Sequence, residues 1–361
     1  MAFTTFYEKS IEKMLTHLHL QHFRNHTSFS YDIPKKGMLI VGRNGSGKTS
    51  ILEALSLLSL TKSFRSTNIA PIIEQEQEWM EIEGTTEKEN LLYRWQIAPI
   101  RKTAFRRNDV LMGTSEILRK KNFLVTLFSP DDLLLPFVSP LMRRKYLNRF
   151  LSPLFPEHLS LLHRFEKILF SRNALLKRIG EGKASAEELG FYDEEFAKSS
   201  EEISKTREKL FTSLQKSLSK NYQTISGKQD NFQIIFHPSS RSETLQKLKK
   251  HQQKDICRGA TSIGAHVDDF SFLLREQPLS EAGSRGEVRS ALISLKMAEI
   301  EYAEEISSIR PILLLDDVFS ELDEQRRGHL FEFIKKQQTI ITATDIPQKE
   351  WEGIDFPVLE L

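Results

Sequence analysis

Cysteine and long apolar runs are nearly absent from this sequence. Its 361 residues include one cysteine, Cys257, which excludes an internal disulfide framework and suits a reducing compartment. No apolar run approaches the ~20 residues that a membrane span needs. Residues 1–13 are charged and lack the apolar core of a secretory signal. We therefore expect a cytoplasmic protein in which residues 1–13 form an N-terminal extension.

A large excess of charge is also absent. The 51 Lys and Arg residues against 49 Asp and Glu residues leave a net charge of +2 at pH 7. Since no overall field draws such a chain to nucleic acid, any binding of that kind must use local basic patches. No basic motif interleaved with aromatic residues, typical of RNA-binding modules, is present. The length suits a globular protein with two lobes.

The most specific motif fits the phosphate-binding pattern G-x-x-x-x-G-K-[ST] without a mismatch, and it consists of Gly42, Arg43, Asn44, Gly45, Ser46, Gly47, Lys48 and Thr49. The apolar run 38–41 predicts a strand before it, and helical spacing after it predicts a helix with Ile51, Leu52, Leu55 and Leu58 on one face. In this context backbone N–H groups surround phosphates, Lys48 reaches the β- and γ-phosphates, and Thr49 contacts Mg²⁺. We expect ATP and Mg²⁺ to bind here; the alternative is a chance glycine turn before a helix.

A second motif is an apolar strand, residues 311–315, that ends in Asp316 and Asp317. In phosphate-loop enzymes the first such acid holds Mg²⁺, and a second can orient or deprotonate the attacking water. We therefore predict that Asp316 and Thr49 are the metal-binding residues and that Asp317 and Lys48 are the catalytic residues. The alternative is a buried strand followed by a solvated turn.

A third motif, Ser284-Arg285-Gly286, opens a segment with helical spacing. Serine followed by glycine at a helix start makes an anion-binding cap. Because the chain already has one phosphate loop, a second cap suggests a shared nucleotide, with Ser284 and Gly286 among the ATP-binding residues. The alternative is an ordinary N-cap before an amphipathic helix.

The order of these motifs resembles the ABC-type ATPases of the SMC group. Further segments narrow the resemblance to the RecF family, which lacks the long arms of SMC proteins: Phe23-Arg24-Asn25, Ser63-Phe64-Arg65, Ser171-Arg172-Asn173-Ala174-Leu175-Leu176, Ser284-Arg285-Gly286 and the run from Leu314 to Asp323. The resemblance extends from about residue 14 to the end. The sequence departs from the family pattern at Glu287, where glutamine is usual, at Ala265 and Val267, and within residues 137–140.

The resemblance implies an α/β fold, namely an ABC-type P-loop ATPase head with a mixed sheet and helices, plus a largely helical second lobe. We expect the head to comprise residues 14–128 and 276–361 and the helical lobe to comprise residues 129–275, with a helical hairpin near 194–220. Ser320 to Asp323 would be the D-loop at a dimer interface, and Thr344-Asp345 would hold a switch residue.

The same resemblance implies a function in recombinational DNA repair. ATP would join two subunits into a homodimer that binds duplex DNA near single-strand gaps, and hydrolysis would release the DNA. RecR, RecO and RecA are the implied partners, with RecA loading at gaps as the task.

Basic clusters could supply the DNA contacts, since phosphate contacts need such charges and carry little sequence information. The candidates are Lys62, Arg65, Arg101, Lys102, Arg106, Arg107, Arg143 and Arg144, with a further cluster at Arg119, Lys120 and Lys121. The alternative for any single cluster is a solvated face balanced by acids elsewhere.

Two other functions are open from the residues alone. The motor subunit of a membrane transporter also pairs a phosphate loop with a Ser-Gly helix, but its central motifs lie closer together than these. The second open function is a nucleotide-gated adaptor without useful turnover. It stays open because Asp317 stands where many related ATPases carry glutamate.

Overall fold

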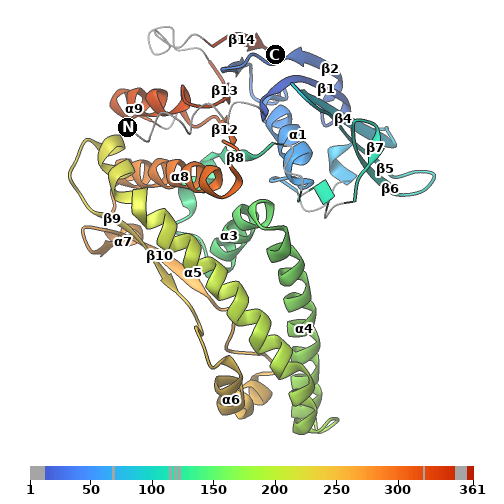
Figure 1. Cartoon of the computed structure of the whole chain (residues 1–361), viewed down its shortest axis with the longest axis vertical. Helices are drawn as coiled ribbons and strands as arrows, with labels where there is room; N and C mark the ends of the chain where they lie inside the picture. The colour runs from blue at the N-terminus through green and yellow to red at the C-terminus, as the bar shows by residue number, and fades with distance from the viewer. Residues whose placement is uncertain are drawn as a thin grey trace. The chain divides into compact units, whose positions relative to one another are not determined.

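The computed structural model describes residues 13–66, 70–113, 116–117, 119, 123–319, 322–345 and 356–361 (Figure 1). Most of the expected N-terminal extension therefore lies outside the described residues, as do Lys120, Lys121, Ser320 and Glu321. The chain divides into two compact units. The first contains the chain up to Leu133, Lys220–Lys228 and Ser284–Leu361; the second contains Leu134–Ser219 and Gln229–Gly283.

The first unit holds two sheets. The antiparallel sheet has the strand order β2-β1-β4-β5-β6-β7, made by β1 (Leu15–Phe23), β2 (His26–Asp32), β4 (Trp79–Thr86), β5 (Asn90–Gln96), β6 (Lys102–Arg107) and β7 (Val110–Leu111). The parallel sheet has the order β14-β3-β13-β12-β8, made by β3 (Gly37–Val41), β8 (Val125–Phe128), β12 (Ile312–Asp316), β13 (Thr339–Ala343) and β14 (Val358–Glu360).

Helix α1 (Lys48–Leu60) packs against strands of both sheets and fills the space between them. Its apolar face forms one core with residues of β1, β4, β3 and β12. The four residues predicted to share that face, Ile51, Leu52, Leu55 and Leu58, are all fully buried. The first unit also contains η2 (Ala70–Ile72), most of η3 (Pro130–Leu134) and the helices α8 (Arg285–Ser307) and α9 (Glu324–Ile334).

Strands β3, β12 and β13 are buried along their whole length. Parallel strands that are covered on both faces have this continuous apolar character. The apolar runs 38–41 and 311–315, which predicted strands, accordingly lie in β3 and β12. Since the carboxyl ends of parallel strands meet at one edge, the loop after β3 and the acids after β12 lie at the same edge.

Glycine is common in turns, but Gly84 lies inside β4, opposite Leu91 of β5. A Cβ atom at Gly84 would lie 2.7 Å from Leu58 Cδ1 and 3.1 Å from Leu15 Cδ1. The glycine therefore allows α1 to approach the sheet closely, and such close approach is a common reason for a glycine within a strand.

The second unit is largely helical. It contains α3 (Pro140–Leu154), α4 (Pro156–Gly180), η4 (Ala186–Leu189), most of α5 (Gly190–Ser226), α6 (Thr244–Arg258), α7 (Leu279–Ala282) and an antiparallel sheet of β9 (Phe232–His237), β10 (Asp269–Leu274) and β11 (Gln277–Pro278). The hairpin expected near residues 194–220 does not lie within that segment, because α5 is continuous there. Helices α4 and α5 instead form a helical hairpin with each other (Figure 1), and Phe165 of α4 packs on Phe196 of α5 with ring centroids 5.0 Å apart. Among the described helices, none is long and apolar enough to cross a membrane.

Arg172 of α4 is the centre of a buried network of ion pairs and hydrogen bonds. The guanidinium is fully buried; its Nε donates to Asp193 over 2.8 Å, and its Nη1 donates to Asp255 over 3.2 Å and to the hydroxyl of Thr261 over 2.7 Å. Buried charges persist only where they are paired in this way. Arg172 therefore fastens α4 to α5 and α6, and it plays a structural part.

Candidate nucleotide site

The phosphate loop connects β3 to α1 with backbone geometry that requires glycine. Gly45 and Gly47 have φ angles of 87° and 105°, in the left-handed region that other L-residues rarely adopt. At Gly42 a Cβ atom would lie 2.7 Å from the carbonyl oxygen of Leu361, so a side chain is excluded there by close approach. The loop residues predicted from the sequence thus form one continuous turn at the start of α1.

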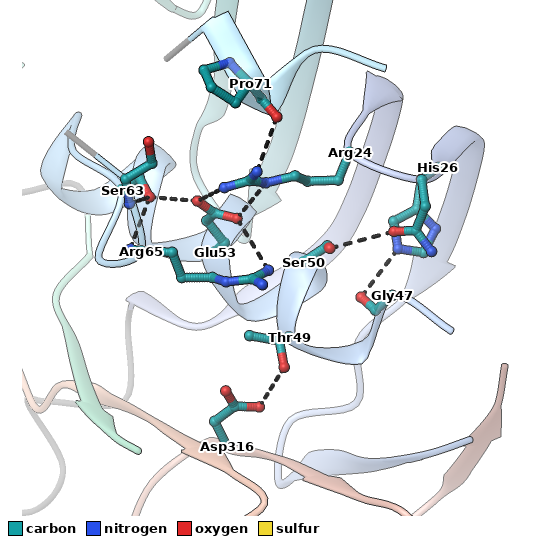
Figure 2. Close-up of polar contacts among 12 residues, drawn as sticks. Arg24, His26, Gly47, Thr49, Ser50, Glu53, Ser63, Arg65, Pro71 and Asp316 are labelled. Carbon is teal, nitrogen blue, oxygen red and sulfur yellow. Dashed lines mark hydrogen bonds and ion pairs between the residues drawn. The ribbon is translucent and has the colours of Figure 1, made fainter. Parts of the chain in front are cut away.

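Two side chains outside the motif support this turn. Asn25 Nδ2 donates to the carbonyl oxygen of Gly45 over 3.2 Å. The Nε2 atom of His26 donates to the carbonyl oxygen of Gly47 over 3.2 Å (Figure 2). Ser50 in turn donates to Asn25 over 3.4 Å. Because these side chains bond two carbonyl groups of the loop, they hold its backbone in the turn conformation that anion-binding loops use.

Lys48 lies folded over the loop. Its ammonium group donates to the carbonyl oxygens of Gly42 and Arg43, the second over 3.0 Å. Lys48 is only 8% exposed, and it lines the pocket in front of the loop.

The predicted metal ligands come together although they are 267 residues apart. Thr49 Oγ1 donates to Asp316 Oδ1 over 2.8 Å, and Thr342 Oγ1 donates to the same oxygen over 2.8 Å. Hydroxyl and carboxylate oxygens are the donors that Mg²⁺ prefers, so this pair fits the ion. Within the described part of the chain no group of three or more His, Cys, Asp and Glu residues could hold a metal ion.

Asp317 has a left-handed backbone, with φ of 51°. Its N–H donates to Thr342 Oγ1 over 3.0 Å, so Thr342 fixes both acids: it donates to one and accepts from the backbone of the other. Thr342 was not singled out from the sequence, because in the apolar strand 339–343 only its register beside Asp316 shows its position.

These residues surround a pocket of about 520 Å³ in the first unit. Its lining consists of Arg24, Asn25, Asn44, Gly45, Gly47, Lys48, Thr49, Ser50, Arg65, Pro71, Ile73, Gln75, Asp316 and Asp317. A pocket with a phosphate loop on one side and two acids on another has the chemistry to bind a nucleoside triphosphate with a divalent cation. Thr344 approaches Asn44 of the loop at 3.5 Å, from the end of β13.

Ser284 and Gly286 are not among the described residues that line this pocket. Ser284 caps α8 in a capping box: its hydroxyl and its N–H donate to Glu287 Oε2 over 2.9 and 3.0 Å. A Cβ atom at Gly286 would lie 2.9 Å from Arg326 Nη2. The carboxylate of Glu287 therefore occupies the cap, and it also pairs with Lys228 at 3.5 Å.

The basic candidates fall into different environments. Lys62, Arg101, Lys102, Arg106 and Arg119 are exposed. Arg107 pairs with Glu89, and Arg65 lines the nucleotide pocket.

The arginine pair of α3 is held within the second unit. Arg143 makes two bonds of 2.7 Å to Asp269, and Arg144 donates to the carbonyl oxygen of Asp268 over 2.9 Å. Burial lowers the pKa of the Arg144 guanidinium below its ordinary value. Since Asp269 already neutralises Arg143, that guanidinium is poorly suited to a DNA phosphate in this conformation.

Comparison with known proteins gives consistent relatives. A family model described as an AAA ATPase domain matches residues 14–340. The DNA replication and repair protein RecF of Lachnoclostridium phytofermentans is 31% identical over 341 residues, covering 92% of each chain. RecF of Leptospira interrogans is 33% identical with the same coverage, and RecF of Halalkalibacterium halodurans is 32% identical, covering 95% of this chain and 94% of the relative.

Solved structures agree. A structure of the recombination mediator protein RecF with ATP, in the RecFOR pathway, has a TM-score of 0.83 and 28% identity and covers 92% of both chains. An Smc head domain from Pyrococcus furiosus has a TM-score of 0.52 at 15% identity, covering 92% of this chain and 89% of that one, which shows a shared fold. With its phosphate loop and acids in place, the chain is an ATPase with an ABC-type head, and it belongs to the RecF family of DNA replication and repair proteins.

Proposed function

We propose that two copies of this ATPase pair around ATP and Mg²⁺ and then hold duplex DNA near a single-strand gap. The observation that carries the proposal is that the N-terminus of α8 lies outside the pocket that the phosphate loop lines. The phosphate loop and acids line one pocket, whereas the capped start of α8, with Ser284 and Gly286, is not part of that lining. A second subunit could therefore bring its α8 to the γ-phosphate, as the resemblance to SMC-like heads implies.

Each part of the pocket has a distinct task in this proposal. The loop N–H groups and Lys48 neutralise the β- and γ-phosphates, and Thr49 with Asp316 holds Mg²⁺, which stabilises developing charge on the phosphate oxygens. Asp317 orients the attacking water or accepts its proton. Thr342 supports this division of labour, because it bonds the side chain of one acid and the backbone of the other.

For DNA contacts we favour the exposed basic residues of the first unit: Lys62, Arg101, Lys102 and Arg106. Within the part of the chain that the structure describes, none of these four side chains forms an ion pair like those of Arg143 and Arg107. RecR, RecO and RecA are the partners by family, with loading of RecA as the task. A cytoplasmic location belongs to the same proposal and is supported by the lone cysteine.

Sedimentation velocity of the purified protein with and without ATP and Mg²⁺ tests the pairing. We expect a shift from monomer to dimer only with both, and no shift for Lys48→Ala, which serves as the control. Anisotropy of labelled duplex and gapped DNA, measured in parallel, should show tighter binding under the dimer conditions. An unchanged sedimentation coefficient at saturating ATP would contradict the shared nucleotide.

A further inference from the structure

Behind the nucleotide pocket lies a buried carboxylate, Glu53, that faces two guanidinium groups. Its side chain is 0% exposed. Arg24 Nε and Nη2 donate to its two oxygens over 2.9 and 2.8 Å, and Arg65 Nη1 lies 3.8 Å from it (Figure 2). The hydroxyl of Ser63 donates to the same carboxylate. One anion thus serves two cations that both line the pocket.

The two arginines are held differently. Arg24 makes a bidentate pair, and its Nη1 also donates to the carbonyl oxygen of Pro71 over 2.9 Å. Among described residues, three of its five N–H groups have acceptors, so its guanidinium is fixed in orientation. Arg65 is 46% exposed and makes a long contact, so it is held loosely at the rim.

The contacts of Glu53 also tie together three segments that are distant in sequence. Arg24 sits in the turn between β1 and β2 with φ of 58°, and its N–H donates to Ile72 of η2 over 2.7 Å. Ser63 accepts from the N–H groups of residues 65 and 66, both over 3.0 Å, which shapes the loop after α1. All three segments contribute to, or lie beside, the pocket wall formed by Arg24, Arg65 and Pro71.

From this geometry we propose that Glu53 is a positioning residue of the nucleotide site, acting by holding Arg24 at the pocket wall and Arg65 at its rim. Glu53 itself does not line the pocket, so it acts through the arginines. The pair of cations exceeds the one anion by a single charge, which leaves the wall positive toward a polyphosphate. The proposal rests on the pocket assigned above as the ATP site.

The test is a double-mutant cycle on ATP affinity, measured by titration with a fluorescent ATP analogue. Glu53→Gln and Arg24→Gln should each weaken binding about tenfold, or roughly 1.4 kcal/mol. The double variant replaces the ion pair by two amides that can bond each other, so it should fold, yet its affinity should equal that of the single variants. Non-additivity of this kind marks residues that act as one unit.

Glu74→Gln is the matched control. Glu74 accepts from His22 over 2.8 Å and from Thr27, so it anchors the same pair of strands without lining the pocket. Its substitution should leave ATP affinity unchanged. If Glu53→Gln alone is too unstable to assay, Glu53→Asp keeps the charge, shortens the reach to Arg24 and should still weaken binding.

Two results would overturn the proposal. Recovery of full affinity in the double variant would show that the cluster only stabilises the fold. Unchanged or tighter ATP binding by Glu53→Gln would show that Glu53 is a mere counter-charge. Lys48→Ala tests separately whether the pocket is the ATP site. If the pocket is misassigned, the Lys48→Ala variant should bind ATP normally.

Discussion

Replacing Asp317 by asparagine separates chemistry from binding in this site. Asp317 has a left-handed backbone, and asparagine tolerates that region better than most residues, so the substitution should preserve the local fold. The backbone N–H that donates to Thr342 is also retained. Only the charge and basicity of the side chain change.

The expected effect follows from the role of a catalytic base. Positioned acid-base groups contribute roughly 10²- to 10⁴-fold, so hydrolysis should slow by that factor, or about 3–5 kcal/mol in the activation free energy. ATP affinity should stay near that of the wild type, because the lost interaction matters mainly in the transition state. The ATP-bound dimer should then accumulate and remain on DNA longer.

Single-turnover hydrolysis, ATP titration and DNA dissociation are the measurements. Asp317→Ala is a useful comparison, because alanine in a left-handed backbone adds roughly 1–2 kcal/mol of strain, so it should lower thermal stability where asparagine does not. Hydrolysis by Asp317→Asn at the wild-type rate would refute the assignment. Equal loss of ATP binding in Asp317→Asn and in Asp316→Asn would refute the division between the two acids.

The remaining predictions concern the other parts of the site. Lys48→Ala should abolish ATP binding or turnover in a folded protein, as measured by titration, because the phosphates lose their neutralising charge. Asp316→Asn should weaken Mg·ATP binding roughly 10- to 100-fold, and equal affinity in a Mg²⁺ titration would argue against its role. Ser284→Arg should leave ATP binding by the monomer intact and prevent ATP-dependent dimerisation, detectable by light scattering. Glu287→Gln should strengthen that dimerisation, by roughly tenfold, since it removes a negative charge from the cap that the γ-phosphate would approach; an unchanged dimerisation constant would count against the shared site.

The parts of the site that could be predicted from sequence are those whose signal is local. The phosphate loop needs glycines at fixed spacing between a strand and a helix, and the acids need only the end of an apolar strand. The contact of Thr49 with Asp316 then follows, because β3, β13 and β12 are adjacent parallel strands that end at one edge.

Other features could not be predicted because their cause is a distant partner. Glycine is typical of turns, but Gly84 lies in a strand where the close approach of Leu58 leaves no room for a side chain. Arg143 stands next to Arg144 and so resembles a basic patch in the sequence, but Asp269, which is 126 residues away, neutralises its charge. Glu53 has no local signal either: a glutamate in a helix is ordinarily exposed, and only the fold brings Arg24 to it.

Helix α1 links these local and distant contributions. Thr49 and Glu53 are four residues apart, so they lie on the same side of the helix, one turn from each other. One of them bonds Asp316 and the other bonds Arg24, and both of these partners line the nucleotide pocket. Since α1 is packed between two sheets with its apolar face fully buried, it cannot shift one contact without moving the other. The helix that begins at the phosphate loop therefore fixes Asp316 and Arg24 relative to each other.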